Sequence, residues 1–244
     1  MKKPKVILRS TKFILKQNFQ PAWVGIFTNP FFLIRYHLFK NIKNLSWYIS
    51  GDLMDFGCGR KPYENLFKVD KYIGVDVKVS GHDHLLSKID IYYDGITVPL
   101  PANTFDSVVC FEVLEHVFNP SQILPELNRV LKTGGKFLLS VPFCWNEHEV
   151  PYDYARYSSF GIKHLLESNG FRVIELRKSG NFNLVIVQLR ILYLFELFKR
   201  LGRIGYFFTL FFSCPLAIWG LFISSILPKD KSLYFNTVVV AEKI

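Results

Sequence analysis

The segment from Pro142 to Ser158 holds the residues best suited to acid–base chemistry. It places polar and aromatic side chains, His148 and Asp153 among them, between two apolar stretches. Histidine titrates near neutral pH, so His148 can take a proton from a hydroxyl group, and Asp153 can orient the imidazole or act as a second base. His116 is a further candidate base, with a capping or core-packing role as the alternative.

A tight turn follows the apolar run Leu53–Phe56, in the order Gly57, Cys58, Gly59. Glycines let the backbone adopt conformations closed to other residues, and they let a ligand approach without Cβ atoms in the way. A dinucleotide-binding turn carries a third glycine where this sequence has Pro62, so we do not expect NAD.

Acidic residues end or follow the next apolar runs. Asp76 ends one run and is suited to holding two ribose hydroxyls. Asp94 and Gly95 can lie beside an adenine, or they can simply form an Asp-Gly turn. Glu112 ends a longer apolar run at the point where the chain turns towards His116.

These residues need a scaffold that brings them to one edge. Short apolar runs bounded by Gly, Pro and Asp alternate with amphipathic stretches, which predicts an α/β fold with a doubly wound sheet. Ligands bind such sheets at the carboxyl ends of the strands. The expected strands are Leu53–Phe56, Tyr72–Val77, Ile89–Tyr93, Phe105–Phe111, Lys136–Pro142, Phe171–Leu176 and Asn236–Lys243.

Two helices are expected between these strands. One runs from Asn119, a possible N-cap, to Lys132, with Gly134 ending it and Pro125 kinking or splitting it. The other runs over 158–169 with a serine cap.

Four ordered motifs now identify a resemblance. The turn after Leu53–Phe56, the run ending in Asp76, the run ending in Glu112 with Leu-Glu-His after it, and the 126–135 segment resemble the class I S-adenosylmethionine-dependent methyltransferases over about residues 51–180. The resemblance implies a seven-stranded Rossmann-like sheet and S-adenosylmethionine as cofactor. It places Asp55 and the turn residues Gly57, Cys58 and Gly59 around the methionine part, Asp76 on the ribose, Asp94 and Gly95 beside the adenine, and Glu112 beneath the cofactor.

Composition adds what surrounds this core. Hydrophobic residues make up 50% of the chain, charged ones 20% and aromatic ones 16%, which excludes a disordered chain. The four cysteines are scattered, with no Cys/His cluster at metal spacing, so we expect no metal site and no disulfide framework.

Four segments follow: a basic aromatic N-terminal arm (1–50), the methyltransferase core (51–180), an apolar insertion (181–230) and the final strand (231–244). Residues 204–227 carry no charge and could span a bilayer by length. A single span would separate the final strand from its sheet, so the insertion must return, as a hairpin or as an interfacial helix bent at Pro215. The interfacial form is favoured because residues 182–203 carry several charges, and a hydrophobic cap or dimer surface is the alternative.

The arm carries nine basic and no acidic residues before Asp52, which indicates an anionic partner surface. Trp23, Phe27, Phe31, Phe32 and Trp47 could insert among lipid headgroups, and a cleavable signal peptide is not expected.

We therefore expect an enzyme on the cytoplasmic face of the cell membrane, peripheral or monotopic, that methylates a hydroxyl of a saccharide or lipid-linked glycan. The glycan comes only from resemblance to relatives that act on surface polysaccharides. A quinone or lipid methyltransferase is the main alternative. An RNA methyltransferase or a non-catalytic protein of the same fold is disfavoured, and no nucleic-acid partner is expected.

Overall fold

The computed structural model describes the chain except for residues 1–12, 14–15, 80 and 82–85. The chain divides into two compact units, and the boundary falls inside helix α2 (Phe32–Leu45). The N-terminal arm and the apolar insertion contribute to one unit, and the methyltransferase core forms the other. The helical unit comprises Met1–Lys40 and Ser179–Phe235, and the sheet unit comprises Asn41–Lys178 and Asn236–Ile244.

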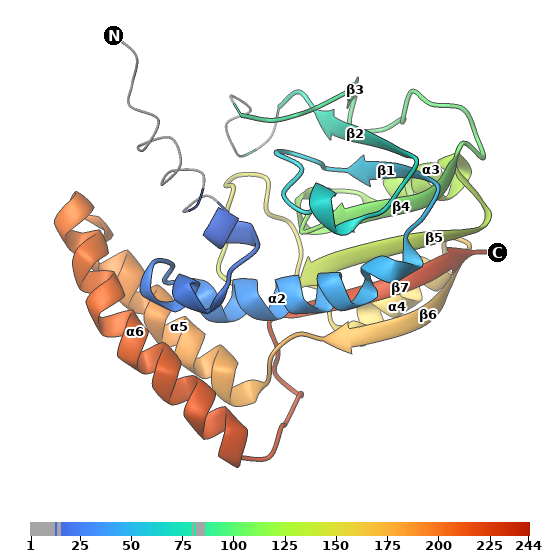
Figure 1. The fold of residues 1–244 in the computed structure, drawn as a ribbon. Helices are drawn as coiled ribbons and strands as arrows, with labels where there is room; N and C mark the ends of the chain where they lie inside the picture. Colours follow the sequence, from blue (N-terminus) through green and yellow to red (C-terminus); the bar gives the residue numbers. More distant parts are fainter. Residues whose placement is uncertain (1–12, 14–15, 80, 82–85) are drawn as a thin grey trace, which may run out of the picture. The chain divides into compact units, whose positions relative to one another are not determined.

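The sheet unit is built on one seven-stranded sheet in the order β3-β2-β1-β4-β5-β7-β6 (Figure 1). Strands β1 to β5 pair in parallel, and β7 runs antiparallel between β5 and β6. The predicted α/β class and doubly wound sheet are confirmed. The strands are β1 (Asp52–Phe56), β2 (Lys71–Val77), β3 (Ile91–Tyr93), β4 (Phe105–Phe111), β5 (Leu131–Pro142), β6 (Phe171–Lys178) and β7 (Asn236–Lys243).

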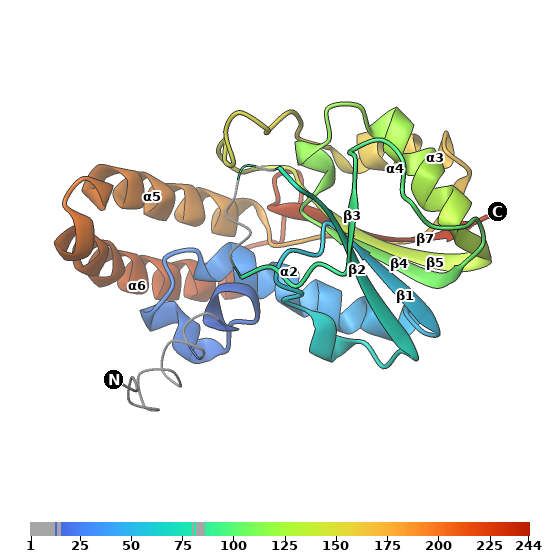
Figure 2. The same ribbon diagram turned by 90° about the horizontal axis from the view of Figure 1, so that it is seen from above.

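The central strands form because their residues are apolar on both faces. Val108, Val109 and Cys110 of β4 are all fully buried, as are Phe137–Leu139 of β5. Parallel strands covered on both faces have continuous apolar runs, which is why the bounds of β4 and the end of β5 at Pro142 were predicted correctly. Helices α3 (Pro120–Val130) and α4 (Ser159–Glu167) follow β4 and β5 and lie on the same face of the sheet (Figure 2).

The predicted end of α3 was wrong. The helix ends at Val130, two residues before the predicted Lys132, so Gly134 does not close it, and Asn119 precedes it without a side-chain cap. Leu131 is fully buried and already pairs with Phe105, so β5 starts there. Gly134 has a φ of 78° and serves an irregularity inside β5.

Two further details of the predicted helices were tested. Pro125 lies within α3 without splitting it, although a proline removes one helical hydrogen bond. Ser158 caps α4 as predicted, with its hydroxyl accepting a hydrogen bond from the Gly161 N–H.

The short 3-10 helices are η2 (Ser46–Tyr48), η3 (Glu64–Leu66) and η4 (Leu114–His116) in the sheet unit, and η1 (Trp23–Phe27) in the helical unit.

The helical unit contains an antiparallel pair, α5 (Phe182–Lys199) and α6 (Gly202–Ile226), which lie side by side in both views (Figures 1 and 2). Asn183 near the start of α5 donates hydrogen bonds to the Gly220 carbonyl and the Ser224 hydroxyl near the end of α6. The insertion is therefore a hairpin, which was the less favoured of the two predicted forms. Pro215 lies inside α6 and does not end it.

Helix α6 exposes large apolar side chains and buries small residues. Its buried residues are Gly205, Thr209, Ser213, Ala217, Gly220 and Ser224, which recur every three or four positions. At Gly220 an added Cβ would lie 2.9 Å from Val187 of α5, so small residues let the two helices approach closely. Among the described residues, α6 alone is long and apolar enough by length and composition to cross a membrane, and only 28% of that stretch is buried.

The arm's aromatic residues differ in exposure, and Phe31 is half-buried with its ring 5.0 Å from that of Phe195. Trp23, Phe27 and Trp47 are exposed, as an interfacial role requires. Phe32 is buried, and its ring stacks on Tyr36 with centroids 5.3 Å apart, so the expectation that Phe32 inserts among headgroups was wrong. The basic residues Lys2, Lys3, Lys5, Arg9 and Lys12 lie outside the described residues.

Candidate functional site

The Gly-x-Gly turn leaves the carboxyl end of β1 in a conformation that favours glycine. Gly57 and Gly59 have φ angles of 73° and 44°. A Cβ on Gly57 would collide with Val113, so the turn packs against the chain that follows β4. At Gly59, no described residue other than its chain neighbours has an atom within 4 Å of where the Cβ would be. The turn is therefore closed on one side and open on the side where a ligand can approach.

Cys58 belongs to the closed side of this turn. Its side chain is buried, and its sulfur would lie 2.7 Å from a Cβ placed on Gly74. Burial raises the pKa of the Cys58 thiol, so it stays protonated and packs as a small apolar group.

Asp76 joins the turn directly from the end of β2. Its Oδ2 accepts a hydrogen bond of 2.9 Å from the Gly59 N–H, and its Oδ1 accepts one of 2.8 Å from the Val77 N–H. Each carboxylate oxygen has a second lone pair, so Asp76 can still accept hydrogen bonds from a ligand. The structure thus brings Gly59 and Asp76 together, as their sequence positions predicted.

Asp55 is buried beneath the same turn. The Tyr72 hydroxyl donates a 2.6 Å hydrogen bond to Asp55 Oδ2. Burial raises the pKa of Asp55 to about 7, and this effect outweighs the Tyr72 hydrogen bond and the charge of Lys61. Asp55 therefore changes charge near neutral pH and will favour a cationic ligand when ionised.

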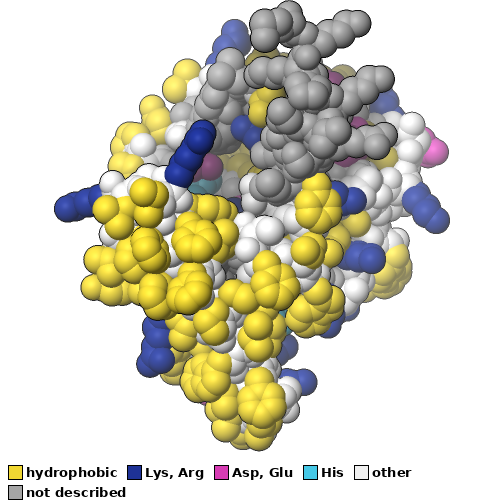
Figure 3. Space-filling model, turned by 60° about the vertical axis from the view of Figure 1, so that its left-hand side comes forward, with side chains coloured by type: hydrophobic (Ala, Val, Ile, Leu, Met, Phe, Trp, Pro, Cys, Tyr) yellow, Lys and Arg dark blue, Asp and Glu magenta, His cyan; other side chains and the backbone are white. Residues whose placement is uncertain are grey.

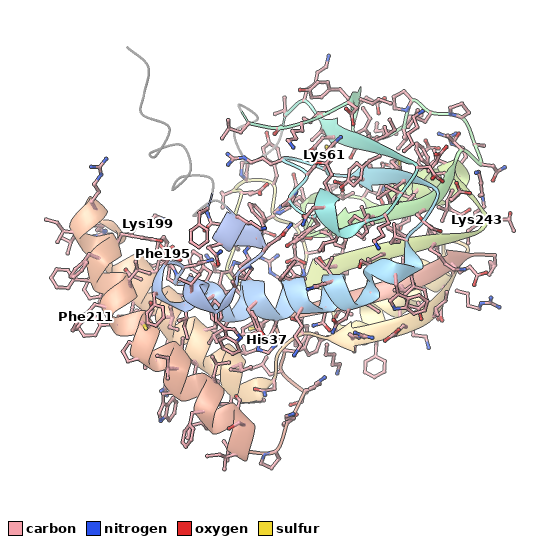
Figure 4. The ribbon with its side chains drawn as sticks, viewed as in Figure 1. His37, Lys61, Phe195, Lys199, Phe211 and Lys243 are labelled. Atoms are coloured by element: carbon pink, nitrogen blue, oxygen red, sulfur yellow. The ribbon has the colours of Figure 1, made fainter. Side chains whose placement is uncertain are left out.

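An ion pair between Lys61 and Asp90, which was not predicted from the sequence, lies beside Asp55 and Tyr72. Lys61 Nζ lies 2.5 Å from Asp90 Oδ2, which also accepts a 2.6 Å hydrogen bond from the Gly74 N–H. The same ammonium lies 5.0 Å from the centre of the Tyr72 ring, and Figure 4 labels Lys61 beside these strands. The pair links residues far apart in sequence, so no local spacing could reveal it.

Asp94 and Gly95 form an exposed turn after β3. Asp94 Oδ1 accepts hydrogen bonds of 2.8 and 2.7 Å from the N–H groups of Ile96 and Thr97. Tyr93 pairs with Val77, which places this turn next to the end of β2. The Asp-Gly turn alternative therefore describes its local structure, and a role beside adenine stays a prediction.

Glu112 turns its side chain into the sheet. Its Oε1 accepts a 2.6 Å hydrogen bond from Ser140 on β5, and its Oε2 accepts one of 2.7 Å from Asn236 on β7. With a φ of 55°, Glu112 holds a backbone conformation that costs a non-glycine residue about 1–3 kcal/mol. Its carboxylate is thus engaged by the sheet, and its backbone is the part left to pass beneath a cofactor.

Glu115 and His116 lie in η4, directly after Val113 and hence beside the turn. Glu115 is completely buried, and within the part of the chain that the structure describes neither of its carboxylate oxygens has a hydrogen-bond partner. Burial and the nearby Glu112 raise the pKa of Glu115 well above its usual value. His116 Nδ1 lies 2.8 Å from the Tyr152 carbonyl oxygen, which ties η4 to the loop after β5.

That loop brings the second predicted histidine to the first. The rings of His116 and His148 meet edge to face with centroids 4.8 Å apart. His148 Nδ1 lies 3.2 Å from Asp153 Oδ2, and the His148 N–H donates a 2.8 Å hydrogen bond to the same oxygen. Burial, with the adjacent His116, lowers the pKa of His148, so its imidazole is neutral at neutral pH.

Arg156 fixes this loop. Its guanidinium donates two 2.6 Å hydrogen bonds to the two carboxylate oxygens of Asp153. Burial alone would raise the pKa of Asp153. Hydrogen bonds from Arg156 and from the backbone N–H of His148, together with the Arg156 charge, outweigh this effect and lower the pKa of Asp153 to about 2. Asp153 is therefore ionised at neutral pH and lies where it can orient the His148 ring.

Comparisons with known proteins agree with this geometry. A methyltransferase-domain family matches residues 34–176, more than half of the chain. A protein of Mycolicibacterium smegmatis named as a probable S-adenosylmethionine-dependent methyltransferase is 28% identical over 137 residues, which cover 54% of this chain and 51% of that protein. The chain spans about half the length of the curated relatives it matches.

Solved structures share the fold at low identity. An S-adenosylmethionine-dependent methyltransferase from Mesorhizobium loti superposes with a TM-score of 0.50 at 13% identity, covering 85% of this chain and 98% of that one. Phosphoethanolamine N-methyltransferase 2 from Haemonchus contortus, in complex with S-adenosylmethionine, superposes with a TM-score of 0.52 at 18% identity, covering 93% of this chain and 58% of that one. The family match, together with the sheet order and the glycine turn, places the chain in the class I S-adenosylmethionine-dependent methyltransferase family, whose cofactor is S-adenosylmethionine.

Proposed function

We propose that the protein transfers a methyl group from S-adenosylmethionine to a hydroxyl of a saccharide or lipid-linked glycan at the cytoplasmic face of the membrane. The observation that carries the reaction is the joining of Gly59 to Asp76 at the carboxyl ends of β1 and β2. It is combined with the contact between His116, which follows β4, and His148, which lies in the loop after β5. The residues that we assign to the cofactor and the residues that we assign to proton transfer follow the carboxyl ends of strands in one sheet, where ligands bind in this kind of fold.

The cofactor roles follow the strand ends. Asp55 and the turn from Gly57 to Gly59 take the methionine part, where the ionised carboxylate favours the cationic ammonium and sulfonium groups. Asp76 accepts hydrogen bonds from the ribose hydroxyls. The turn at Asp94 and Gly95 flanks the adenine.

The acceptor roles fall to the loop after β5. Methyl transfer is an in-line displacement, so much of the acceleration comes from holding the acceptor oxygen opposite the sulfur. We assign His148 as the base that removes the hydroxyl proton, with Asp153 orienting its ring at 3.2 Å. The oxygen–carbon bond forms as the sulfur–carbon bond breaks, and S-adenosylhomocysteine leaves.

The membrane part of the proposal rests on the outer face of α6. A helix in a water-soluble core buries its large apolar side chains and exposes its polar ones, whereas α6 buries Gly205, Thr209 and Ser213 and exposes aromatic rings. Figure 3 shows hydrophobic side chains gathered over one broad face of the molecule, and Phe211 projects from α6 in Figure 4. Such a contiguous apolar surface is typical of a membrane or partner interface.

Basic residues and an apolar groove supplement this face. Lys199, Arg200 and Arg203 are exposed at the turn between α5 and α6, where each can gain about 1 kcal/mol beside an anionic leaflet. An open groove of about 550 Å³, lined by Ile186, Leu189, Arg190, Tyr193, Leu194 and Leu216, is almost wholly apolar and would suit an acyl chain. This groove equally favours the second candidate, a quinone or other lipid as acceptor.

A transfer assay with methyl-tritiated S-adenosylmethionine tests the proposal. The purified chain is incubated with lipids, glycans and RNA fractionated from the source cell, with an Asp76→Ala variant as the control for cofactor use. Label in a glycan or glycolipid fraction that Asp76→Ala abolishes supports the proposal. Label in quinone or simple lipid supports the second candidate, and label confined to RNA contradicts both.

A further inference from the structure

Four side chains with metal-ligand chemistry meet beside the residues assigned to the cofactor: Glu115, His116, His148 and Glu149. One ligand atom from each of the first three lies within 4.8 Å of the others. His116 Nε2 lies 3.9 Å from Glu115 Oε1 and 4.0 Å from Glu149 Oε2. These separations are too long for hydrogen bonds. They approach the spacing of about 3.4 Å between the ligands of a tetrahedral ion whose bonds are about 2.1 Å long.

Glu115 supplies the strongest indication of a missing partner. Its side chain is completely buried, yet neither carboxylate oxygen has a hydrogen-bond partner among the described residues. Buried polar groups are nearly always paired, because an unpaired one keeps its full desolvation cost. Protonation would remove the charge and still leave both oxygens unpaired. A cation between Glu115 and the histidines would compensate the charge and provide the contact.

Both imidazoles are oriented as metal ligands are. His116 Nδ1 faces the Tyr152 carbonyl oxygen at 2.8 Å, and a carbonyl only accepts, so Nδ1 carries the proton and Nε2 is left as a ligand. His148 Nδ1 lies closer to two acceptors, Asp153 Oδ2 at 3.2 Å and the Asn146 carbonyl oxygen at 3.3 Å, than to one donor, the Arg156 guanidinium at 3.5 Å. We therefore place the proton on Nδ1, which leaves Nε2 as a ligand. Metal-binding histidines usually donate their other N–H to a carboxylate or carbonyl in this way.

We propose that Glu115, His116 and His148, with Glu149 as a fourth ligand, bind one divalent transition-metal ion. Two imidazoles with carboxylates favour ions such as Zn²⁺, Co²⁺ or Fe²⁺ over Mg²⁺ and Ca²⁺, which prefer oxygen ligands. The two glutamates balance the charge of the ion. The nearby Arg156 donates hydrogen bonds to both oxygens of Asp153, and the negative charge of that carboxylate offsets the repulsion between the guanidinium and the ion.

The sequence predicted no metal because that expectation considered clusters at short spacing. His116 and His148 lie on different segments and meet only because the loop after β5 folds over η4, through the Tyr152 carbonyl and a 2.8 Å hydrogen bond from the Tyr154 N–H to the Glu115 carbonyl. The cluster is therefore a product of the tertiary fold.

The role of the ion rests on the proposed hydroxyl methylation, whereas its binding does not. An ion with an exchangeable coordination position can take the acceptor hydroxyl and lower its pKa. The hydroxyl proton then leaves to water, and the oxygen attacks the methyl carbon as the sulfur–carbon bond breaks. When the ion is bound, His148 acts as a metal ligand and no longer as the base, and the ion activates the hydroxyl in its place.

Metal titration of the full chain tests the site without any methyl acceptor. After chelation and dialysis, Zn²⁺ is titrated by calorimetry, and Co²⁺ is titrated by its visible d–d absorption. We expect one ion per chain and intense four-coordinate Co²⁺ bands. His116→Gln and His148→Gln should each weaken binding by about 100-fold or more. His164→Gln, at an exposed histidine on α4, is the matched control and should bind as the unaltered chain does.

Two results would overturn the site. One is the absence of a bound ion at equimolar protein and metal. The other is equal affinity in His148→Gln and His164→Gln, which would place any bound ion elsewhere. S-adenosylmethionine affinity is measured on the same metal-free samples, so loss of the metal site with intact cofactor binding leaves the proposed methyl transfer standing.

Discussion

Replacing three aromatic residues on the outer face of α6 should release the protein from membranes. Phe207, Phe211 and Phe222 are 65%, 63% and 62% exposed, and all three lie on the helix surface turned away from α5. Substituting each by serine removes apolar area without removing a contact in the packed interior. Phenylalanine and serine have similar helix propensities, so α6 itself should persist.

The size of the effect follows from that exposure. Full burial of a phenylalanine contributes about 1.5–3 kcal/mol, so a ring with about two thirds of its surface in water can gain about 1–2 kcal/mol in lipid. Three such rings contribute about 3–6 kcal/mol. Each 1.4 kcal/mol is a factor of ten, so the triple variant should partition about 10²- to 10⁴-fold more weakly.

Flotation with vesicles of phosphatidylglycerol and phosphatidylcholine measures this partition. Phe160→Ser is the matched control, because Phe160 is 81% exposed on α4 of the sheet unit and has no expected membrane role. High salt should reduce binding further, since it screens the exposed lysines and arginines. The reasoning fails if the unaltered protein stays in the soluble fraction at low salt. It also fails if the triple variant floats as well as Phe160→Ser, or if its only effect is to dissociate a dimer.

Four further outcomes are expected. Asp76→Asn should weaken S-adenosylmethionine binding about 10- to 150-fold in calorimetry, since a hydrogen bond to a charged acceptor contributes about 1.5–3 kcal/mol, and unchanged affinity would remove Asp76 from the site. Because the pKa of Asp55 is about 7 and a cationic cofactor favours its ionised form, cofactor affinity should fall as pH drops below 7, with proton release on binding; Asp55→Asn should abolish this pH slope, and a slope that persists would contradict the assignment. His148→Ala should lower turnover while leaving cofactor affinity nearly intact; full turnover between about pH 6 and 9 would place the base elsewhere, with His116 next to be tested. Burial, with the charges of Lys40 and Lys231, lowers the pKa of His37 to about 4, so the stability that its neutral form provides is present above pH 6.5 and is lost as pH falls through 4; this amounts to about 3 kcal/mol in urea unfolding, and His37→Gln should remove the dependence.

The sequence predicted the strands well because their apolar runs are buried on both faces, and it located Asp76 because that residue ends such a run. The end of α3 was misplaced because Gly134 resembles a helix stop, whereas the burial of Leu131 starts the next strand sooner. Phe32 was misassigned because an aromatic residue in a basic arm gives no sign of which way its ring faces.

The parts of the site that could not be predicted depend on tertiary contacts. The Lys61–Asp90 ion pair joins two loops, and the unpaired carboxylate of Glu115 becomes apparent only when its burial is known. The meeting of His116 with His148 depends on how the loop after β5 folds. The sequence shows the type of each of these residues, but it does not show which residue each one contacts in the folded chain.

The most direct test of the central claim is a crystal structure of the chain with S-adenosylmethionine bound. We expect the ribose hydroxyls to lie within hydrogen-bond distance of Asp76, the methionine part against Gly59, and the methyl group to face the side of η4 that carries His116 and His148. Cofactor density away from the carboxyl ends of β1 and β2, or a methyl group facing away from both histidines, would contradict the proposed site.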